Sequence, residues 1–256
     1  MSAATALPVL AATGLAAEAR IAGGPGVVAL AGGGDPARLA LLLQAALERG
    51  AKGVISFGIA GGLAPDIEPG TVLLARAVHH QTSSWTADEA WTDRLASLLP
   101  RALRADLVGV DHVVAGQDGK AALRRRTGAA GVDMESHVAA RLAAQHGVPF
   151  AALRIVADPA HRTLPDAAAV GMRPDGSTDI GAVLRALARR PGDIPALIRT
   201  ALDAGVAFAA LRRSRRQLHG PLGFEAAGPS GPTRSLSRDE VASAPFAGRD
   251  VQVENG

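Results

Sequence analysis

Hydrophobic residues along the chain fall into two alternating patterns. Short apolar runs of strand length, several of them bounded by glycine, are found at Leu7–Ala12, Gly26–Ala31, Gly53–Phe57, Thr71–Val78, Leu107–Val114 and Phe150–Val156. Longer stretches with helical character lie between several of these runs, at Pro36–Arg49, Asp88–Leu99, Lys120–Arg126 and Met134–His146. This alternation predicts an α/β fold with a largely buried central sheet.

Local signals place the ends of some helices and of the domain. Asp35 followed by Pro36 is typical of a helix start, and a further helix is predicted from Asp193 through Leu211. The periodic pattern stops after His219, and residues 220–256 are rich in Gly, Pro and Ser. We therefore expect one folded domain over residues 1–219 and a disordered tail over 220–256.

Composition excludes several classes of protein. The 256 residues are 48% apolar and carry a formal charge of only +3, so no nucleic-acid coat is implied. Aromatic residues make up 3% and tyrosine is absent, which argues against base-stacking platforms for nucleic acid. Without cysteine there are no disulfides or thiolate metal sites, and no apolar stretch is long enough for a predicted transmembrane helix. We expect a cytoplasmic protein that binds no nucleic acid.

Three segments could carry chemistry, and each also has a plain structural interpretation. The glycine-rich segment Ser56–Leu63 follows an apolar run, and it is either a tight turn or a close approach to a ligand. In Gly131–His137, Asp133 is a candidate helix cap and Glu135 a candidate first-turn acid. Alternatively, a carboxylate at this position accepts hydrogen bonds from the two hydroxyls of a ribose. Asp158, before Pro159, either starts a turn or supplies a ligand group at a strand end.

Taken together, these segments resemble a known family in order and spacing. Nucleoside phosphorylases and 5′-methylthioadenosine/S-adenosylhomocysteine nucleosidases have a Gly-x-Ala-Gly-Gly segment, then Met-Glu, then a strand ending in a catalytic aspartate. Gly58–Gly62, Met134-Glu135 and Asp158 match this series, and the similarity spans Pro8 to Leu211. The resemblance implies a single-domain, three-layer α/β/α fold with a central mixed sheet.

The resemblance also implies site residues. Asp158 would protonate the leaving adenine, and Glu135 would bind the ribose hydroxyls. Met134 would pack beneath the sugar or simply in the core. The other implied substrate-binding residues are Ala60, Gly61, Gly62 and Val114.

The identity of the nucleophile stays open at this stage. Glu18 matches the water-activating glutamate of the nucleosidases, and a carboxylate repels phosphate. In contrast, Gly33, Gly34 and Arg38 lie at a predicted helix start that could bind an anion, which leaves inorganic phosphate as a candidate co-substrate. Ile59 departs from the family pattern, because a hydroxyl residue is usual at its position.

Further segments are similar to the hopanoid-associated phosphorylase branch, namely Thr13–Arg20, Ser56–Gly62, Asp133–His137 and Arg173–Gly176. This similarity implies adenosylhopane, a lipid-linked adenine nucleoside, as substrate. Between Arg185 and Arg216 there are eight arginines and two aspartates, which suits peripheral contact with an anionic membrane or a solvated basic helix. By resemblance we also expect a homodimer or higher homo-oligomer.

The sequence leaves two alternative functions open and predicts that the protein has no metal or cofactor. A small-substrate methylthioadenosine/S-adenosylhomocysteine nucleosidase is the first alternative, and a non-catalytic nucleoside-binding relative, favoured by Ile59, is the second. Because no histidines and acids show metal-ligand spacing along the sequence, we predict no metal and no cofactor. His79-His80 ends a predicted strand and could contact a ligand.

Overall fold

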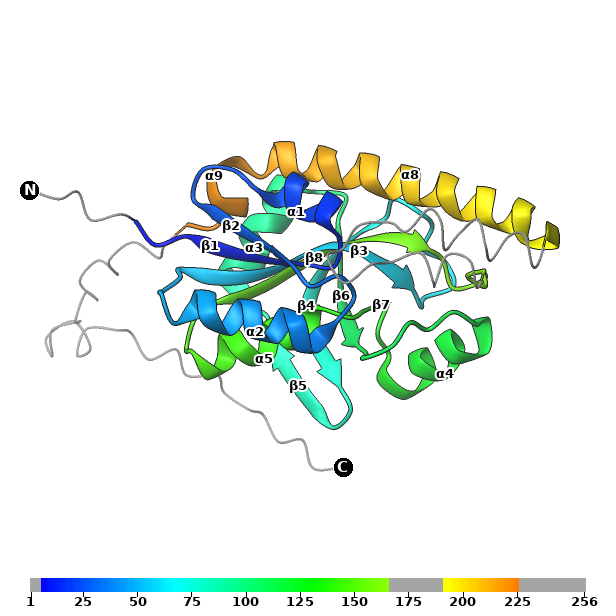
Figure 1. Ribbon diagram of the computed structural model, residues 1–256, viewed down its shortest axis with the longest axis horizontal. Coiled ribbons are helices and arrows are strands. Elements are labelled where there is room, and N and C mark those ends of the chain that lie inside the picture. Colours follow the sequence, from blue (N-terminus) through cyan, green and yellow to red (C-terminus); the bar gives the residue numbers. More distant parts are fainter. Residues whose placement is uncertain (1–5, 166–190, 226–256) are drawn as a thin grey trace, which may run out of the picture. The chain divides into compact units, whose positions relative to one another are not determined.

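A computed structural model describes residues 6–165 and 191–225, and within them eight strands form one mixed sheet (Figure 1). The strands are β1 (Val9–Thr13), β2 (Val27–Ala31), β3 (Gly53–Gly62), β4 (Val72–His80), β5 (Ser83–Thr86), β6 (Leu103–Gly109), β7 (Gly131–Asp133) and β8 (Phe150–Asp158). The order runs β2-β1-β3-β7-β6-β4-β5, while β8 pairs with both β3 and β4. The strand pairings β3-β8-β4-β6-β7 therefore close into a circuit.

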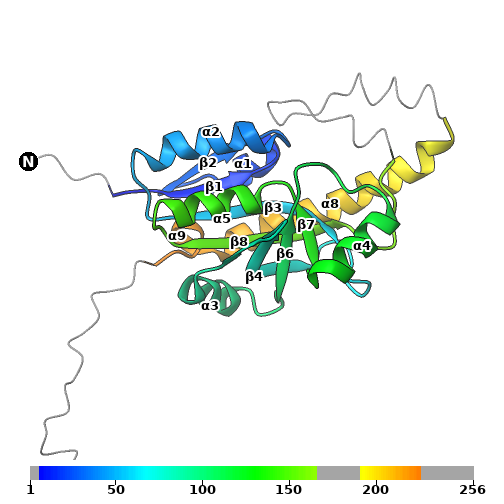
Figure 2. The ribbon, with the colours of Figure 1, turned by 90° about the horizontal axis from the view of Figure 1, so that it is seen from below.

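The helices of the described segments are α1 (Ala16–Ala22), α2 (Pro36–Leu47), α3 (Glu89–Leu98), α4 (Gln117–Thr127), α5 (Ser136–Gln145), α8 (Ile194–Gln217) and α9 (His219–Leu222), with a 3₁₀ turn at Pro191–Asp193. Alternation along β3 explains why both faces of the sheet are covered. Val54 packs in a core with α2 and α5, whereas Ile55 and Phe57 pack in a second core with α1, α3 and α8. Figures 1 and 2 show these two sets of helices on opposite faces, which confirms the predicted α/β class with its mixed sheet.

Several predicted boundaries are wrong. The strand predicted at Leu107–Val114 is β6, which starts at Leu103 and ends at Gly109. A side chain at Gly109 would overlap the ring of His137, and the chain leaves the sheet there as a loop. The helix predicted at Met134–His146 starts only at Ser136. Just before this start, the Asp133 carboxylate accepts hydrogen bonds from the backbone amides of Glu135 and Ser136.

The sequence patterns also missed four short elements. Helices α1 and α9 and strands β5 and β7 have three to seven residues, too few for a period to stand out. The glycine-rich segment predicted to follow a strand is itself the second half of β3.

The domain extends past the predicted end at His219. Leu222 is buried, its carbonyl accepts a hydrogen bond from Trp91 Nε1, and Phe224 packs edge-on against Trp91. The compact unit therefore reaches Glu225, and the rest of the predicted tail lies outside the described residues.

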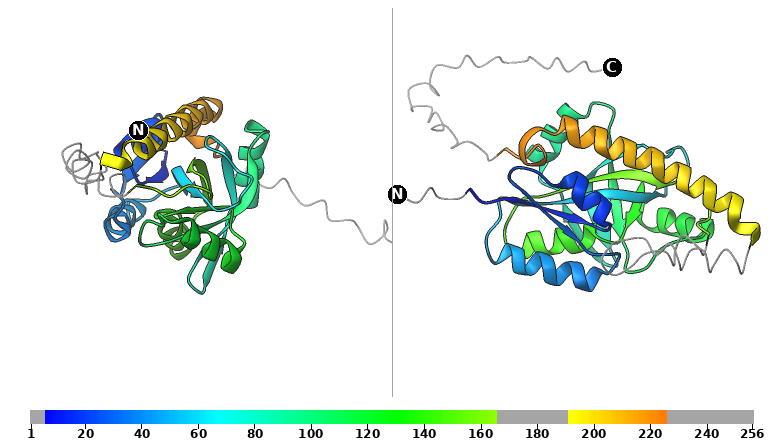
Figure 3. Two further views of the ribbon diagram at one scale, coloured as in Figure 1. Left: turned by 90° about the vertical axis from the view of Figure 1, so that its right-hand side faces the viewer. Right: turned by 45° about the horizontal axis from the view of Figure 1, so that its top comes forward.

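Helix α8 runs along one face of the sheet and continues beyond it, as Figures 1 and 3 show. Ala207, Ala210 and Leu211 bury one of its sides in the core, and Arg215 donates to the carbonyls of Ala22 and Gly23 at the end of α1. By length and composition alone, this helix is also long and apolar enough to cross a membrane.

Candidate active site

The three motifs meet in one cavity of about 280 Å³ at the carboxyl ends of β1, β3, β7 and β8. Strand ends of this kind collect ligand-binding groups in α/β sheets. Its charged lining residues, among those that the structure describes, are all acids: Glu18, Asp133, Glu135 and Asp158. The sequence predicted that Glu18, Glu135 and Asp158 form one site, and the structure places them together.

Glu18 is held in place by backbone amides. Its Oε2 accepts from Gly14 N at 2.8 Å and Leu15 N at 2.7 Å, and its Oε1 accepts from Ile59 N at 2.7 Å. The side chain is almost fully buried, and this burial raises the pKa of Glu18 despite the nearby Arg154 and the three amides. The result is a fixed carboxylate with an increased affinity for a proton.

Arg154 lies beneath the cavity, in the middle of β8, and has no exposed surface. Its guanidinium is 3.3 Å from Asp133 Oδ2 and 3.1 Å from Glu135 Oε2, and it donates to Ile59 O at 3.2 Å. Burial alone would lower the pKa of Arg154, but the neighbouring carboxylates outweigh it and raise that pKa. One permanent cation therefore neutralises part of a buried cluster of acids.

Glu135 lies against the end of β1. A Cβ at Gly14 would come within 2.6 Å of Glu135 Oε1, so the glycine leaves room for this carboxylate. Burial raises the pKa of Glu135 to about 7, and the charges of Asp133 and Glu18 add to the effect while Arg154 opposes it. Met134 also lines the cavity.

Asp158 forms an ion pair that the sequence patterns did not predict. Lys120, on α4, is completely buried, and its Nζ donates to Asp158 Oδ2 at 2.5 Å, Pro159 O at 3.0 Å and Arg162 O at 2.9 Å. Within the described part of the chain, Asp158 Oδ1 has no hydrogen bond. Burial raises the pKa of Asp158 and outweighs the opposing effect of Lys120.

The glycines of β3 allow close packing around these side chains. A Cβ at Gly58 would lie 2.5 Å from Glu18 Oε1 and 2.8 Å from Arg154 Nη1. Ala60 and Gly61 line the cavity, as predicted, whereas Gly62 does not and instead lies close to Val156 and Pro159.

The residues predicted for phosphate are placed less favourably. Gly34 lines the cavity, but the Gly33 amide donates to Gly14 O, and Arg38 is exposed and is not among the lining residues. The first free amides of α2, at Ala37 and Arg38, both donate to the Asp35 carboxylate. The structure thus brings Gly34 to the cavity but neither Gly33 nor Arg38.

One side of the cavity is apolar. Val110, Val113 and the predicted Val114 come from the loop after β6, and Leu164 lies beside them, its amide bonded to Ala115 O at 3.0 Å. Thr200 and Ala204 bring α8 to the same cavity. The Arg173–Gly176 segment and the first part of the predicted basic stretch lie outside the described residues.

A second cluster lies outside this cavity. His80, Asp111 and His137 lie close together although His80 and His137 are 57 positions apart in the sequence. The sequence suggested a ligand contact for His79-His80 but gave no signal that joined these three residues.

With the geometry in place, the chain can be compared with known proteins. Residues 7–189 match the model of the phosphorylase superfamily, and the chain belongs to that family. No curated protein is significantly similar to it in sequence.

Several solved structures share its fold. A 5′-methylthioadenosine/S-adenosylhomocysteine nucleosidase from Neisseria meningitidis, in complex with methylthio-immucillin-A, is 18% identical with a TM-score of 0.56, over 82% of this chain and 99% of that one. A Helicobacter pylori nucleosidase mutant with 5′-methylthioadenosine in its active site is 13% identical with a TM-score of 0.57, over 84% and 100%. Futalosine hydrolase from Helicobacter pylori is 12% identical with a TM-score of 0.53, over 81% and 98%.

Proposed function

We propose that this protein cleaves the N-glycosidic bond of an adenine nucleoside, with water as the nucleophile. The observation that carries this proposal is the charge of the cavity, whose ionisable lining residues in the described segments are all carboxylates. Departure of adenine leaves positive charge on the ribose, and fixed carboxylates stabilise that charge as it develops. The same carboxylates repel a phosphate dianion.

Asp158 is the proposed general acid. As the bond between C1′ and N9 breaks, its electron pair moves into the base, and a proton from Asp158 to N7 neutralises the leaving group. A raised pKa keeps that proton available, and because Lys120 holds Oδ2, we assign the proton to Oδ1. Lys120 acts here as a positioning residue.

Glu135 and Glu18 are proposed to act on the sugar side. Glu135 accepts hydrogen bonds from the two ribose hydroxyls. Arg154, whose guanidinium is 3.1 Å from Glu135 Oε2, holds this carboxylate from below. Glu18 takes a proton from the attacking water while the water oxygen bonds to C1′. The products are adenine and the sugar, which now has a hydroxyl group on C1′. The three amides on Glu18 hold it in one orientation for this step.

The placement of the α2 residues supports water over phosphate. The helix start that the sequence offered as an anion site already has the Asp35 carboxylate on its amides, and Arg38 is exposed to solvent. Inorganic phosphate is therefore the less favoured co-substrate in this proposal.

For the substrate, we propose adenosylhopane. The apolar side of the cavity, with Val110, Val113 and Leu164, suits a hydrophobic 5′ group. The similarity to the hopanoid-associated branch is the reason for naming this lipid. A small-substrate nucleosidase is the second candidate, favoured by the fold that this chain shares with the methylthioadenosine nucleosidases.

The proposal includes the assembly and location of the protein. We propose a homodimer or higher homo-oligomer that contacts the membrane peripherally through Arg185–Arg216.

The test is adenine release from adenosylhopane in detergent, with and without phosphate, beside 5′-methylthioadenosine. We expect phosphate-independent release from the lipid, and loss of at least a hundredfold in kcat with Asp158→Asn or Glu18→Gln. Glu68→Gln, at an exposed acid, is the matched control and should keep full activity.

The other outcomes are distinct. Release only with phosphate would make the enzyme a phosphorylase and overturn the role of Glu18. Release from 5′-methylthioadenosine alone would replace the lipid substrate by the small one. Binding without release from either compound would identify a non-catalytic relative.

A further inference from the structure

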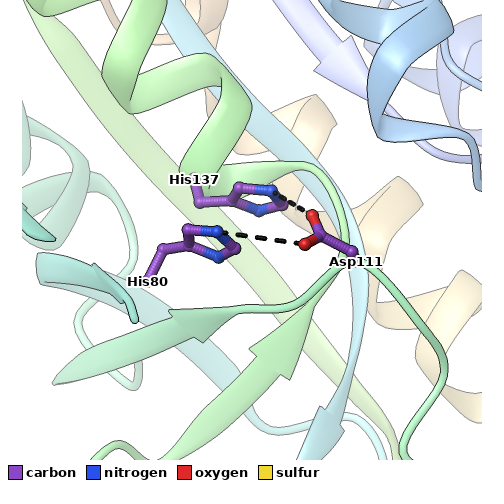
Figure 4. Close-up of side chains that lie close together, drawn as sticks. All are labelled: His80, Asp111 and His137. Carbon is purple, nitrogen blue, oxygen red and sulfur yellow. Dashed lines mark ion pairs between the residues drawn. The ribbon is translucent and has the colours of Figure 1, made fainter. Parts of the chain in front are cut away.

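Two histidines and an aspartate form a compact cluster beside the active site (Figure 4). His80 ends β4, Asp111 lies in the loop after β6, and His137 lies in the first turn of α5. Asp111 Oδ1 is 3.2 Å from His137 Nε2, and Asp111 Oδ2 is 4.0 Å from His80 Nε2. The two rings stack with their centroids 4.3 Å apart. One donor atom from each residue lies within 4.8 Å of the other two.

The hydrogen bonds of the histidines leave one ring nitrogen of each available to bind a metal ion. His80 Nδ1 contacts Gly109 O at 3.1 Å, so this nitrogen carries the hydrogen and Nε2 presents a lone pair. A carbonyl on the second nitrogen is the usual support of a metal-binding histidine. His137 is 94% buried in its side chain, yet its Nδ1 has no hydrogen-bond partner in the described structure. Nδ1 faces Gly109, so Nε2, at 3.2 Å from Asp111 Oδ1, is the ring nitrogen that faces the cluster.

The fold holds His137 in place. A Cβ at Gly109 would come within 2.4 Å of His137 Nδ1, so only glycine allows the ring to lie over the end of β6. His80 and Asp111 are the movable partners, with side chains 20% and 49% exposed. The ring planes are within 10° of parallel, so a turn of His80 about its side-chain torsions is needed to direct both lone pairs to one point.

We propose that His80, Asp111 and His137 form a binding site for a divalent transition-metal ion of the zinc type. Two imidazole nitrogens and one carboxylate oxygen are a recognised three-ligand set for Zn²⁺, with water in the fourth position. Tetrahedral bonds of about 2.0–2.1 Å place ligand atoms roughly 3.4 Å apart. The present contacts of 3.2 and 4.0 Å bracket that spacing. The proposal replaces our expectation, drawn from sequence spacing, that the chain has no metal.

The position of the site suggests what the ion does. Asp111 lies between the cavity-lining residues Val110 and Val113, and His137 follows Glu135 by two positions. An ion bound by both would fasten the loop after β6 to the start of α5. It would thereby fix two segments of the cavity wall without contacting the substrate. The site stands independently of the proposed function, because it rests on the cluster alone.

The test is calorimetric titration of the full-length protein with Zn²⁺ after treatment with a chelator, together with the absorption spectrum of the Co²⁺ form. We expect one equivalent of Zn²⁺ to bind, and Co²⁺ to give the intense visible bands of a tetrahedral site. His80→Gln and Asp111→Asn should each weaken Zn²⁺ binding at least tenfold, and Zn²⁺ should raise the Tm of the wild type but not of these variants.

His79→Gln is the matched control, since His79 is the neighbouring residue on β4 and its Nε2 contacts Asp106 instead. It should bind Zn²⁺ like the wild type. Far-ultraviolet circular dichroism checks that each variant is folded. Absence of stoichiometric Zn²⁺ binding in the wild type would overturn the proposal, and so would equal affinities in the His79→Gln and His80→Gln variants.

Discussion

At the scale of single residues, two buried cations determine how the carboxylates of the cavity behave. Arg154 faces Asp133 and Glu135 from below, while Lys120 holds one oxygen of Asp158. A buried charge is tolerated only when it is paired and hydrogen-bonded, and both cations meet that condition. The acids around them consequently keep defined positions, although their pKa values are raised by burial.

Removal of the Lys120 ammonium tests its positioning role. In Lys120→Met, Asp158 loses an interaction that lowers its pKa, so this pKa should rise further. We expect the alkaline limb of the kcat profile to move to higher pH, and kcat to fall at least tenfold because Oδ2 is no longer held. Lys52→Met, at the other lysine of the chain, should change neither. An unshifted alkaline limb in Lys120→Met would contradict the role.

Glu135 should make folding stability depend on pH. Its pKa is about 7 in the folded protein and about 4.5 when unfolded, so the folded state binds more protons between these values. The free energy of unfolding should therefore fall as pH rises from about 4.5 to 7. Urea unfolding across this range should show a smaller fall for Glu135→Gln than for the wild type. Glu68→Gln, at an exposed acid, serves as control, and an unchanged slope in Glu135→Gln would refute the shift.

At the scale of elements, α8 has two different sides. One side packs on the sheet through Ala207, Ala210 and Leu211. The other exposes the α8 stripe, defined as Ile194, Ile198, Leu202 and Val206, which are 43–66% exposed and recur every four residues. Four exposed apolar residues aligned on one helix face suit contact with a membrane surface.

The stripe can be tested by removing its apolar side chains. The double variant Ile198→Ser/Leu202→Ser should bind anionic liposomes at least tenfold more weakly in a flotation assay, because each lost side chain is worth about 1.5–3 kcal/mol of burial. Leu41→Ser, at a leucine 74% exposed on α2, should leave binding unchanged. Equal flotation of the two variants, or no flotation of the wild type, would remove the membrane role of α8.

At the scale of the whole molecule, motifs predicted the acids but not their partners. Glu18, Glu135 and Asp158 stood at recognisable places in the sequence, so their convergence was predictable. Lys120 looked like one more cation on a basic helix, and only the fold shows that α4 turns it inward. Arg154 did leave a signal, since a single arginine inside the apolar run Phe150–Val156 implies a buried partner.

The metal-binding cluster marks the limit of that approach. His80, Asp111 and His137 come from β4, the loop after β6 and α5, so no local spacing joins them. Their meeting depends on the parallel pairing of β4 with β6 and on the close approach of α5 at Gly109. Tertiary register of this kind is not encoded in any short window of sequence.

The circuit of strands also governs how the sheet can grow. Strands β3, β8, β4, β6 and β7 each find partners on both sides within the circuit, and their backbone groups there are used internally. At the two ends of the strand order, β2 and β5 each have one neighbouring strand. A second copy that extends the sheet at either end of this order would therefore pair with β2 or β5.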